Sequence, residues 1–170
     1  MSLGFDYPDW IRETYDLDTP SMALGGFQSF VELWRGKCRN GAFPAWRDFD
    51  FHDFTHWHGW LSVYDVTGRD PFDFHARLWG TELVELLGHD MTGKSPRCGG
   101  AGPDAFRGGF GEDDMTFMAK VVNEPCLAVT EGAIFWQNRN YVRYTDLFLP
   151  LSSDGQQADG ILNATIKLSG

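Results

Sequence analysis

The end of the chain most strongly constrains its fold. Three runs rich in β-branched and aromatic residues, Cys126–Asn138, Tyr141–Leu151 and Ala158–Leu168, follow one another there. Only short turn sequences separate them, Asn138-Arg139-Asn140 and Ser152-Ser153-Asp154-Gly155. Strands joined by so few residues pair as antiparallel hairpins, because a parallel pair needs a long crossover connection. The sequence therefore predicts an antiparallel sheet.

The rest of the chain adds helices and two more strands to this sheet. Phe27, Phe30, Val31 and Trp34 recur at the spacing of one helix face. The full set of predicted elements is helices at Phe27–Arg39, Phe51–Trp57, Thr81–Leu87 and Glu112–Val122, and strands at Trp60–Val66 and Phe72–Trp79. This order predicts an α+β fold, a five-stranded antiparallel sheet with helices on one face and an N-terminal helical extension. Residues 1–26 are predicted to be a loose arm, and residues 27–170 a single domain.

Charge and length exclude several classes of protein. The formal net charge of −10 disfavours binding to nucleic acids and to anionic membranes. No apolar run is long enough to cross a membrane, and the N-terminus lacks the pattern of a signal peptide. The three cysteines form no CxxC pair, so neither a disulfide framework nor a cysteine zinc site is predicted. We therefore expect a cytoplasmic protein.

Six local strings follow one another along the chain: Phe30–Arg35, Asp48-Phe49-Asp50, Val63–Val66, Phe74–Thr81, Gly88–Gly93 and Leu147–Leu151. In this order they resemble a family of short bacterial PAS-domain proteins of unassigned function. The resemblance covers residues 27–166, although a proline expected near Phe51 and an aliphatic–proline pair near Trp57 are missing. The resemblance implies a sensory or signalling module that pairs as a homodimer and can contact a signalling partner, and it assigns no catalytic residue.

The same resemblance implies a cavity between the curved sheet and the middle helices. A small, mostly apolar ligand or a protein partner is the expected target. We expect no fixed cofactor, and the predicted helix Glu112–Val122 contains no histidine that could bind haem iron. The side chains expected to line the cavity are Phe74, Ala76, Leu78, Leu83, Leu86, Met118, Val122, Ile134, Trp136, Leu147 and Leu149.

The string Gly88–Ser95 matches the phosphate-loop pattern GxxxxGK[ST]. A phosphate loop needs a buried strand before it and a helix beginning at the Lys-Ser pair. Here a predicted helix precedes the string, and Pro96 and two glycines follow it. We therefore interpret Gly88 as a helix stop and Thr92-Gly93 as a turn.

Three further groups of polar residues have both a structural and a functional interpretation. His52 and His56 would share a helix face with a spacing that a metal can use, and His58 is near, but a third ligand is not evident and no metal site is assigned. Arg77 and Asp90 are expected to form an ion pair, or else Arg77 anchors a carboxylate ligand. Cys38 precedes the first strands, unlike the reactive cysteine of flavin photosensors, and is interpreted as a small residue near a helix end.

Two alternative functions remain open at this stage. A small cone-fold enzyme could perform proton transfer with Asp146 and Tyr144, although Asp146 is more simply interpreted as a solvent-facing residue. A pure dimerisation scaffold would bury the apolar face of Phe27–Trp34 against a second copy. A pocket in which two titratable side chains converge within hydrogen-bond reach would favour the enzyme, and a pocket lined only by apolar groups would favour sensing.

Overall fold

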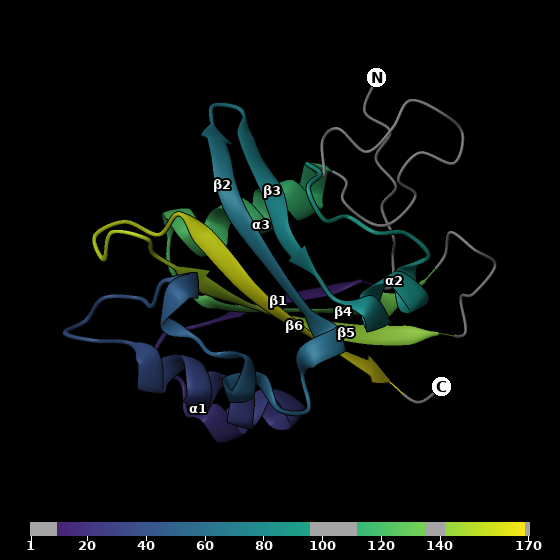
Figure 1. Ribbon diagram of the computed structural model, residues 1–170, viewed down its shortest axis with the longest axis horizontal. Helices are drawn as coiled ribbons and strands as arrows, with labels where there is room; N and C mark the ends of the chain where they lie inside the picture. The colour runs from purple at the N-terminus through teal and green to yellow at the C-terminus, as the bar shows by residue number, and fades with distance from the viewer. Residues whose placement is uncertain (1–9, 96–111, 135–141, 169–170) are drawn as a thin grey trace.

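The computed structural model of the chain describes residues 10–95, 112–134 and 142–168. One antiparallel sheet, with the strand order β1-β4-β5-β6-β2-β3, forms the centre of the molecule (Figure 1). Its strands are β1 Ile11–Tyr15, β2 Leu61–Arg69, β3 Phe72–Trp79, β4 Leu127–Ala133, β5 Arg143–Leu151 and β6 Gly160–Leu168. The α+β class and the antiparallel sheet are therefore confirmed, but the sheet has six strands instead of five.

The sixth strand comes from the segment that the sequence presented as a loose arm. β1 pairs antiparallel with β4, with Ile11 opposite Glu131 and Tyr15 opposite Leu127. It is a short edge strand whose side chains are mostly exposed, so it lacks the strong hydrophobic alternation that identifies a strand in a sequence. The prediction of a loose arm is wrong for Ile11–Tyr15 because main-chain pairing, which leaves no compositional mark, holds this segment.

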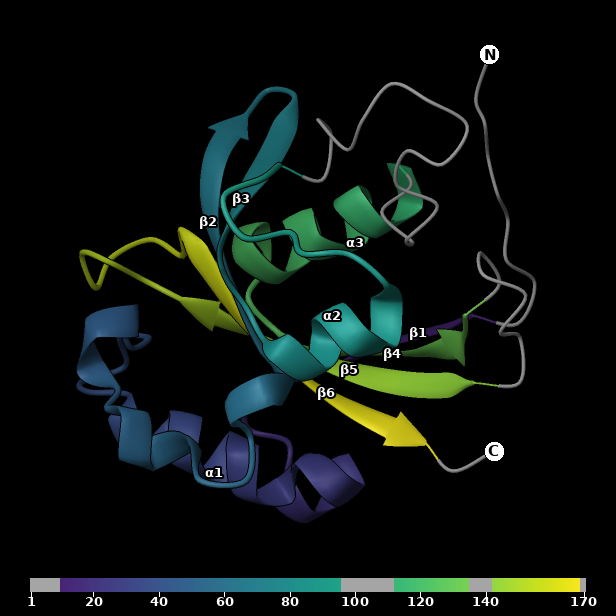
Figure 2. The same ribbon diagram turned by 45° about the vertical axis from the view of Figure 1, so that its right-hand side comes forward.

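Helices cover both faces of the sheet. Figure 2 shows α1 on one side of the strands and α2 and α3 on the other. The helices are α1 Gln28–Lys37, α2 Thr81–Leu87 and α3 Glu112–Asn123, with short 3₁₀ turns η1 Ser21–Phe27, η2 Trp46–Asp48, η3 Phe51–Phe54 and η4 His58–Trp60. Helices on one face were predicted, and this holds only for α2 and α3, because α1 packs against the opposite face.

The predicted apolar face of α1 is buried within the chain itself. Phe30 and Val31 are fully buried, and the Trp34 indole Nε1 donates to the Pro150 carbonyl oxygen at 2.9 Å. These residues share a core with leucines of the central strands, including Leu147 and Leu149. The face is therefore occupied by the sheet, and it is not the dimer interface that the scaffold hypothesis required.

The segment predicted as a helix over Phe51–Trp57 instead forms a single 3₁₀ turn, η3, and a second turn, η4, begins directly after it. η3 ends at Phe54, and His56 adopts a left-handed backbone conformation with φ 77° that no α-helix tolerates. Phe54 is buried against Phe30 with ring centroids 6.1 Å apart, so tertiary packing of this side chain replaces helical periodicity. In the part of the chain that the structure describes, no helix is long and apolar enough to cross a membrane.

A bulge in the β2–β3 pair decides which side chains of β3 face which layer. Tyr64 pairs with Ala76, but the preceding residue Val63 pairs with Leu78, so Arg77 is the extra residue of the ladder. Strict alternation would place Phe74, Ala76 and Leu78 on one face. Because the bulge absorbs one residue, Leu78 packs on the α1 side and Trp79 faces α2 and α3.

Candidate functional site

An internal cavity of about 40 Å³ lies between the sheet and the layer formed by α2 and α3. A space of this size holds roughly three water molecules, which makes it a small site that the fold has left unfilled. Leu83 and Met118 reach the cavity from the two helices. Its other lining residues come from the sheet, from α2 and α3, and from the residue before β1: Trp10, Tyr64, Trp79, Leu87, Asp114, Phe117, Thr130, Tyr144, Asp146, Phe148, Asn163 and Thr165.

The polar floor of the cavity is a row of side chains that lie side by side across four strands. Thr130 on β4 is directly opposite Asp146 on β5, which is opposite Thr165 on β6. Arg12 on β1 is opposite Thr130 and extends the row to the edge of the sheet. Residues that are opposite one another in an antiparallel sheet project to the same face, so the register itself gathers this polar group.

Asp146 is the central residue of the row and is held by neutral donors. Its carboxylate accepts a short hydrogen bond from the Thr165 hydroxyl group. Asn163 lies beside them, donating through Nδ2 to the Leu147 carbonyl oxygen at 3.1 Å and accepting from the Ser62 hydroxyl group at 2.8 Å. Both Ser62 and Asn163 are buried, so these bonds fix the orientation of the floor.

The pKa of Asp146 is raised from its ordinary value of 3.8 to about 7. Desolvation is the main cause, because the side chain faces the cavity and not bulk water; the bonds from Thr165 and Asn163 act in the opposite direction, and the charge of Asp114 adds a smaller increase. Asp146 therefore changes protonation state near neutral pH. The simpler expectation that this residue faces solvent is wrong.

Two tyrosines share the cavity with this carboxyl group. Tyr144 is two residues from Asp146 on β5 and on the same face of the sheet, as the sequence predicted for this pair. Tyr64 comes from β2 and is buried; its pKa is raised, mainly by desolvation, and the charge of Asp146 contributes. Three titratable side chains thus line one space, which keeps the proton-transfer hypothesis open.

The N-terminal end of β1 forms one wall of the cavity. The Arg12 guanidinium group donates to the Asp114 carboxylate on α3 at 2.7 Å, which joins the edge strand to the helical layer. Trp10 packs edge to face against Tyr144 with ring centroids 5.2 Å apart. Its indole ring lies on Gly132, where an added Cβ would come within 2.3 Å of it, so the close approach requires glycine.

Trp79 forms another wall, and its indole N–H lacks an acceptor among the described residues. The residue is only 7% exposed, and Nε1 is buried. His89 stacks on the indole ring with centroids 6.4 Å apart, and burial lowers the pKa of this histidine. An unpaired buried donor is energetically costly. Because Trp79 lines the cavity, a molecule bound there can supply the missing acceptor.

The structure divides the side chains that were predicted to line one cavity. Leu83 and Met118 line it, and five others lie in the same hydrophobic core, namely Phe74, Ala76, Leu86, Val122 and Ile134. Leu78, Leu147 and Leu149 belong to the core on the α1 side of the sheet. Trp136 lies outside the described residues. Leu78 is displaced by the bulge at Arg77, whereas Leu147 and Leu149 were misassigned because the second half of β5 is buried on both faces and both alternating sets are apolar there.

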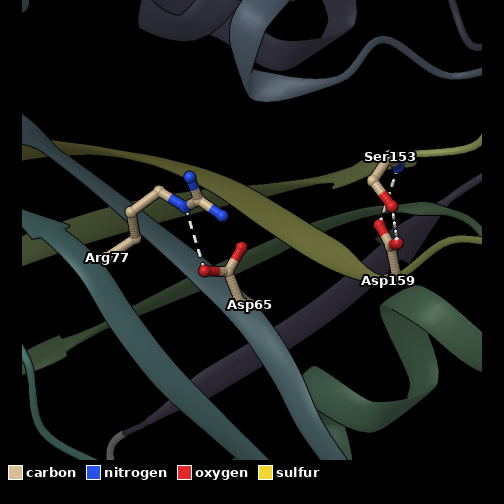
Figure 3. A network of polar contacts seen from close by, with 4 residues as sticks. All are labelled: Asp65, Arg77, Ser153 and Asp159. Carbon is tan, nitrogen blue, oxygen red and sulfur yellow. Dashed lines mark hydrogen bonds and ion pairs between the residues drawn. The ribbon is translucent and has the colours of Figure 1, made fainter.

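The expected ion pair between Arg77 and Asp90 is replaced by a different one. Arg77 Nε donates to the Asp65 carboxylate at 2.9 Å across the β2–β3 pair (Figure 3). Asp90 instead accepts from the backbone N–H of Thr92 within its own turn, and this bond lowers its pKa. The same figure shows Asp159 bonded to Ser153 in the β5–β6 connection.

The phosphate-loop string forms a turn, as predicted. Gly88 ends α2 in a left-handed conformation with φ 86°, and Lys94 Nζ donates to the Asp90 carbonyl oxygen of the same string at 2.9 Å. Gly93 N–H donates to the Ala76 carbonyl oxygen at 2.8 Å, and Ala76 N–H donates back to Lys94 at 3.0 Å. The backbone amide of Gly93 is therefore bonded to β3 and is not available to hold a phosphate.

The histidine cluster lies on the opposite side of the molecule. His52 and His56 are exposed, and His58 stacks on Phe51 with centroids 3.9 Å apart. His56 borders an open groove of about 540 Å³ between α1, η3 and the end of β6. Among the described residues, no three His, Cys, Asp or Glu side chains are grouped so as to hold a metal ion. Cys38 caps the C-terminal end of α1, as interpreted from the sequence.

Comparison of the chain with models of protein families, with curated proteins and with solved structures finds no match.

Proposed function

We propose that this chain is a PAS-like sensory module that binds a small molecule in the cavity between its sheet and the α2–α3 layer. The observation that carries the proposal is a small, partly open cavity with a titratable carboxyl group, Asp146, on its floor. Ligand sites are concave, with apolar walls and a few placed polar groups. The order of strands and helices and the motif strings support the same assignment.

The polar floor changes the expected ligand. A mostly apolar molecule would leave the indole N–H of Trp79 without an acceptor, at a cost of about 1–3 kcal/mol, and would give the desolvated Asp146 carboxyl group no polar contact beyond Thr165 and Asn163. The ligand is therefore small and carries polar groups. Because Trp10 and Arg12 connect β1 to the cavity and to α3, we propose that occupancy is signalled through the docking of β1 and not through α1.

The test compares two substitutions in β4 that each add one carbon-sized atom on opposite faces. Thr130→Ile fills the cavity, and Val129→Ile enlarges the core on the α1 side. Thermal shift against a library of small polar and apolar molecules should find ligands that stabilise the wild type, by about 2.7 kcal/mol at a hundred times Kd. The stabilisation should be lost in Thr130→Ile and kept in Val129→Ile.

Two results would contradict this proposal. One is a library in which no molecule stabilises the wild type. The other is a ligand that stabilises Thr130→Ile as strongly as the wild type, because that ligand binds elsewhere.

A proton-transfer enzyme remains the second candidate because Asp146, with its pKa of about 7, shares the cavity with Tyr64 and Tyr144. Solvent deuterium exchange into a bound ligand distinguishes the two functions. An enzyme exchanges a carbon-bound hydrogen in the wild type and not in Asp146→Asn, whereas a sensor exchanges none in either protein.

The homodimer remains a prediction. The apolar face of Phe27–Trp34 is excluded as its interface, so a Trp34→Asp change should unfold the chain instead of producing monomers. Native mass spectrometry of the purified protein measures the stoichiometry directly.

A further inference from the structure

Asp146 faces the cavity without a cationic partner among the described residues. The nearest basic side chain in its row, Arg12, is engaged by Asp114 at 2.7 Å. That ion pair neutralises Asp114, so one carboxyl group, Asp146, remains uncompensated at the floor. The Asp146 side chain is half-buried and its hydrogen bonds come from neutral groups, Thr165 and Asn163, so a cation in the cavity would stabilise its charged form.

The walls of the cavity suit a cation. Six aromatic rings line it, and three of their contacts are edge to face: Trp10 with Tyr144, Tyr64 with Trp79 and Phe117 with Phe148. The face of an aromatic ring is electronegative and attracts ammonium groups. Carboxylate and rings together make the space favourable for positive charge and unfavourable for anions.

The donor set excludes a hard metal ion. Calcium takes six or more oxygen ligands and magnesium needs octahedral geometry. Here the walls are mainly carbon, and the described residues hold no group of three metal-binding side chains. An organic cation satisfies the same carboxylate while leaving its carbon atoms against the rings.

Trp79 adds a second requirement. Its buried indole N–H has no acceptor among the described residues, although the side chain lines the cavity. An ammonium group cannot accept a hydrogen bond, so it would leave this donor unpaired. A ligand that satisfies both residues has a positive donor at one end and an oxygen acceptor at the other.

We propose that the cavity binds a small organic ammonium ion that also carries an oxygen acceptor, of the size of ethanolamine. This inference rests on the proposed sensory function and names the chemical class of its ligand. The ammonium group donates to the Asp146 carboxylate, the oxygen accepts from Trp79 Nε1, and the carbon atoms contact the aromatic walls. The space of about 40 Å³ limits the ligand to a handful of non-hydrogen atoms.

Three ligands of nearly equal size test the contact with Asp146 and the contact with Trp79 independently. Ethanolamine has both the charge and the oxygen, ethylene glycol lacks the charge, and n-propylammonium lacks the oxygen. Binding is measured by calorimetry at about pH 8, where Asp146 is ionised, in matched salt. Ethanolamine should bind about tenfold more tightly than either analogue, since one charge-assisted or one buried hydrogen bond is lost in each.

Two variants assign these differences to residues. In Asp146→Asn the preference for ethanolamine over ethylene glycol should disappear, and in Trp79→Phe the preference over n-propylammonium should disappear. Asp65→Asn is the matched control, because Asp65 is a surface carboxylate bonded to Arg77 outside the cavity, and it should keep both preferences. Each variant is first confirmed as folded by circular dichroism.

The outcomes separate this inference from the function on which it rests. Equal binding of ethylene glycol and ethanolamine, or binding of ethanolamine that survives Asp146→Asn, overturns the ammonium assignment and leaves the sensory proposal intact. The same conclusion follows if none of the three binds while other library molecules still stabilise the wild type and not Thr130→Ile. If no molecule of either set binds, both proposals fail.

Discussion

The two faces of the sheet are made by the same strands and have opposite characters. On the α1 side, Leu147, Leu149 and Leu162 pack with α1 in a core whose buried members are all apolar. One residue away along the same strands, Asp146 and Asn163 face the other layer and leave a cavity. The two sides of one sheet can therefore differ in character, because successive residues of a strand point to opposite faces.

The largest expected effect concerns pH and tests the cavity side. The folded-state pKa of Asp146 is raised from 3.8 to about 7, so the folded protein retains this proton longer than the unfolded chain. The resulting stabilisation is complete below the pKa of Asp146 in the unfolded chain, 3.8. It is lost as pH rises through the pKa of Asp146 in the folded protein, about 7. Relative to Asp146→Asn, the free energy of unfolding of the wild type should fall by on the order of 4 kcal/mol between about pH 4 and pH 8.

Urea denaturation of the two proteins across this pH range checks the expectation. A difference between them that does not change with pH would mean that the Asp146 carboxyl group is solvated, and the contrast between the faces would then be lost. The groups that face Asp146 and also bear on its titration are Asp114, Arg12, Tyr64 and Tyr144.

The next effect concerns the α1 side. Leu147→Ala removes a fully buried side chain from a filled core and should lower the free energy of unfolding by about 3 kcal/mol. Asp146→Ala, at the neighbouring position, should cost nothing at about pH 8 because it removes an unfavourable charge. Equal losses in the two variants, measured by thermal unfolding, would show that the faces do not differ in this way.

A smaller effect is expected where Trp10 meets the sheet. Gly132→Ala places a Cβ within 2.3 Å of the Trp10 ring, which must move away from the cavity, at a cost of about 1 kcal/mol. The indole N–H resonance of Trp10 should shift in the NMR spectrum. Gly36→Ala is the control on the other side of the sheet: an added Cβ in α1 meets nothing within 4 Å, so this change should stabilise the helix slightly.

The smallest effect lies outside both interiors. Arg77→Ala removes an ion pair with Asp65 in which both side chains are substantially exposed, and it should change the free energy of unfolding by at most about 0.5 kcal/mol. A loss of several times this value would mean that the Arg77 side chain stabilises the bulge itself and does more than form the ion pair with Asp65. Arg77→Gln, which keeps the length of the side chain, distinguishes these explanations.

The sequence predicted well what local pattern determines. The helix face of Phe30, Val31 and Trp34, the stop at Gly88 and the last strands all follow from periodicity and turn residues. It did not predict the pairing of Ile11–Tyr15, because an exposed edge strand has weak periodicity.

The site depends on information that no local window contains. Pairing of β3 with β2 creates a bulge in which Arg77 is the extra residue. Because of this bulge, Trp79 and not Leu78 lines the cavity. The placement of Asp146 required knowing that both faces of β5 are covered. A signal was present, since Leu147–Leu151 is a continuous apolar run, which is typical of a strand buried on both sides.

The turn formed by Gly88–Ser95 has a consequence for self-association. Its bonds to Ala76 occupy the outer edge of β3, whereas among the described strands nothing pairs with the outer edge of β1. At Ala76 the turn thus occupies the backbone groups that an added strand would use, so edge-to-edge joining of two copies is less hindered at β1. A contact between two β1 strands would be isologous, and an isologous contact closes at two subunits.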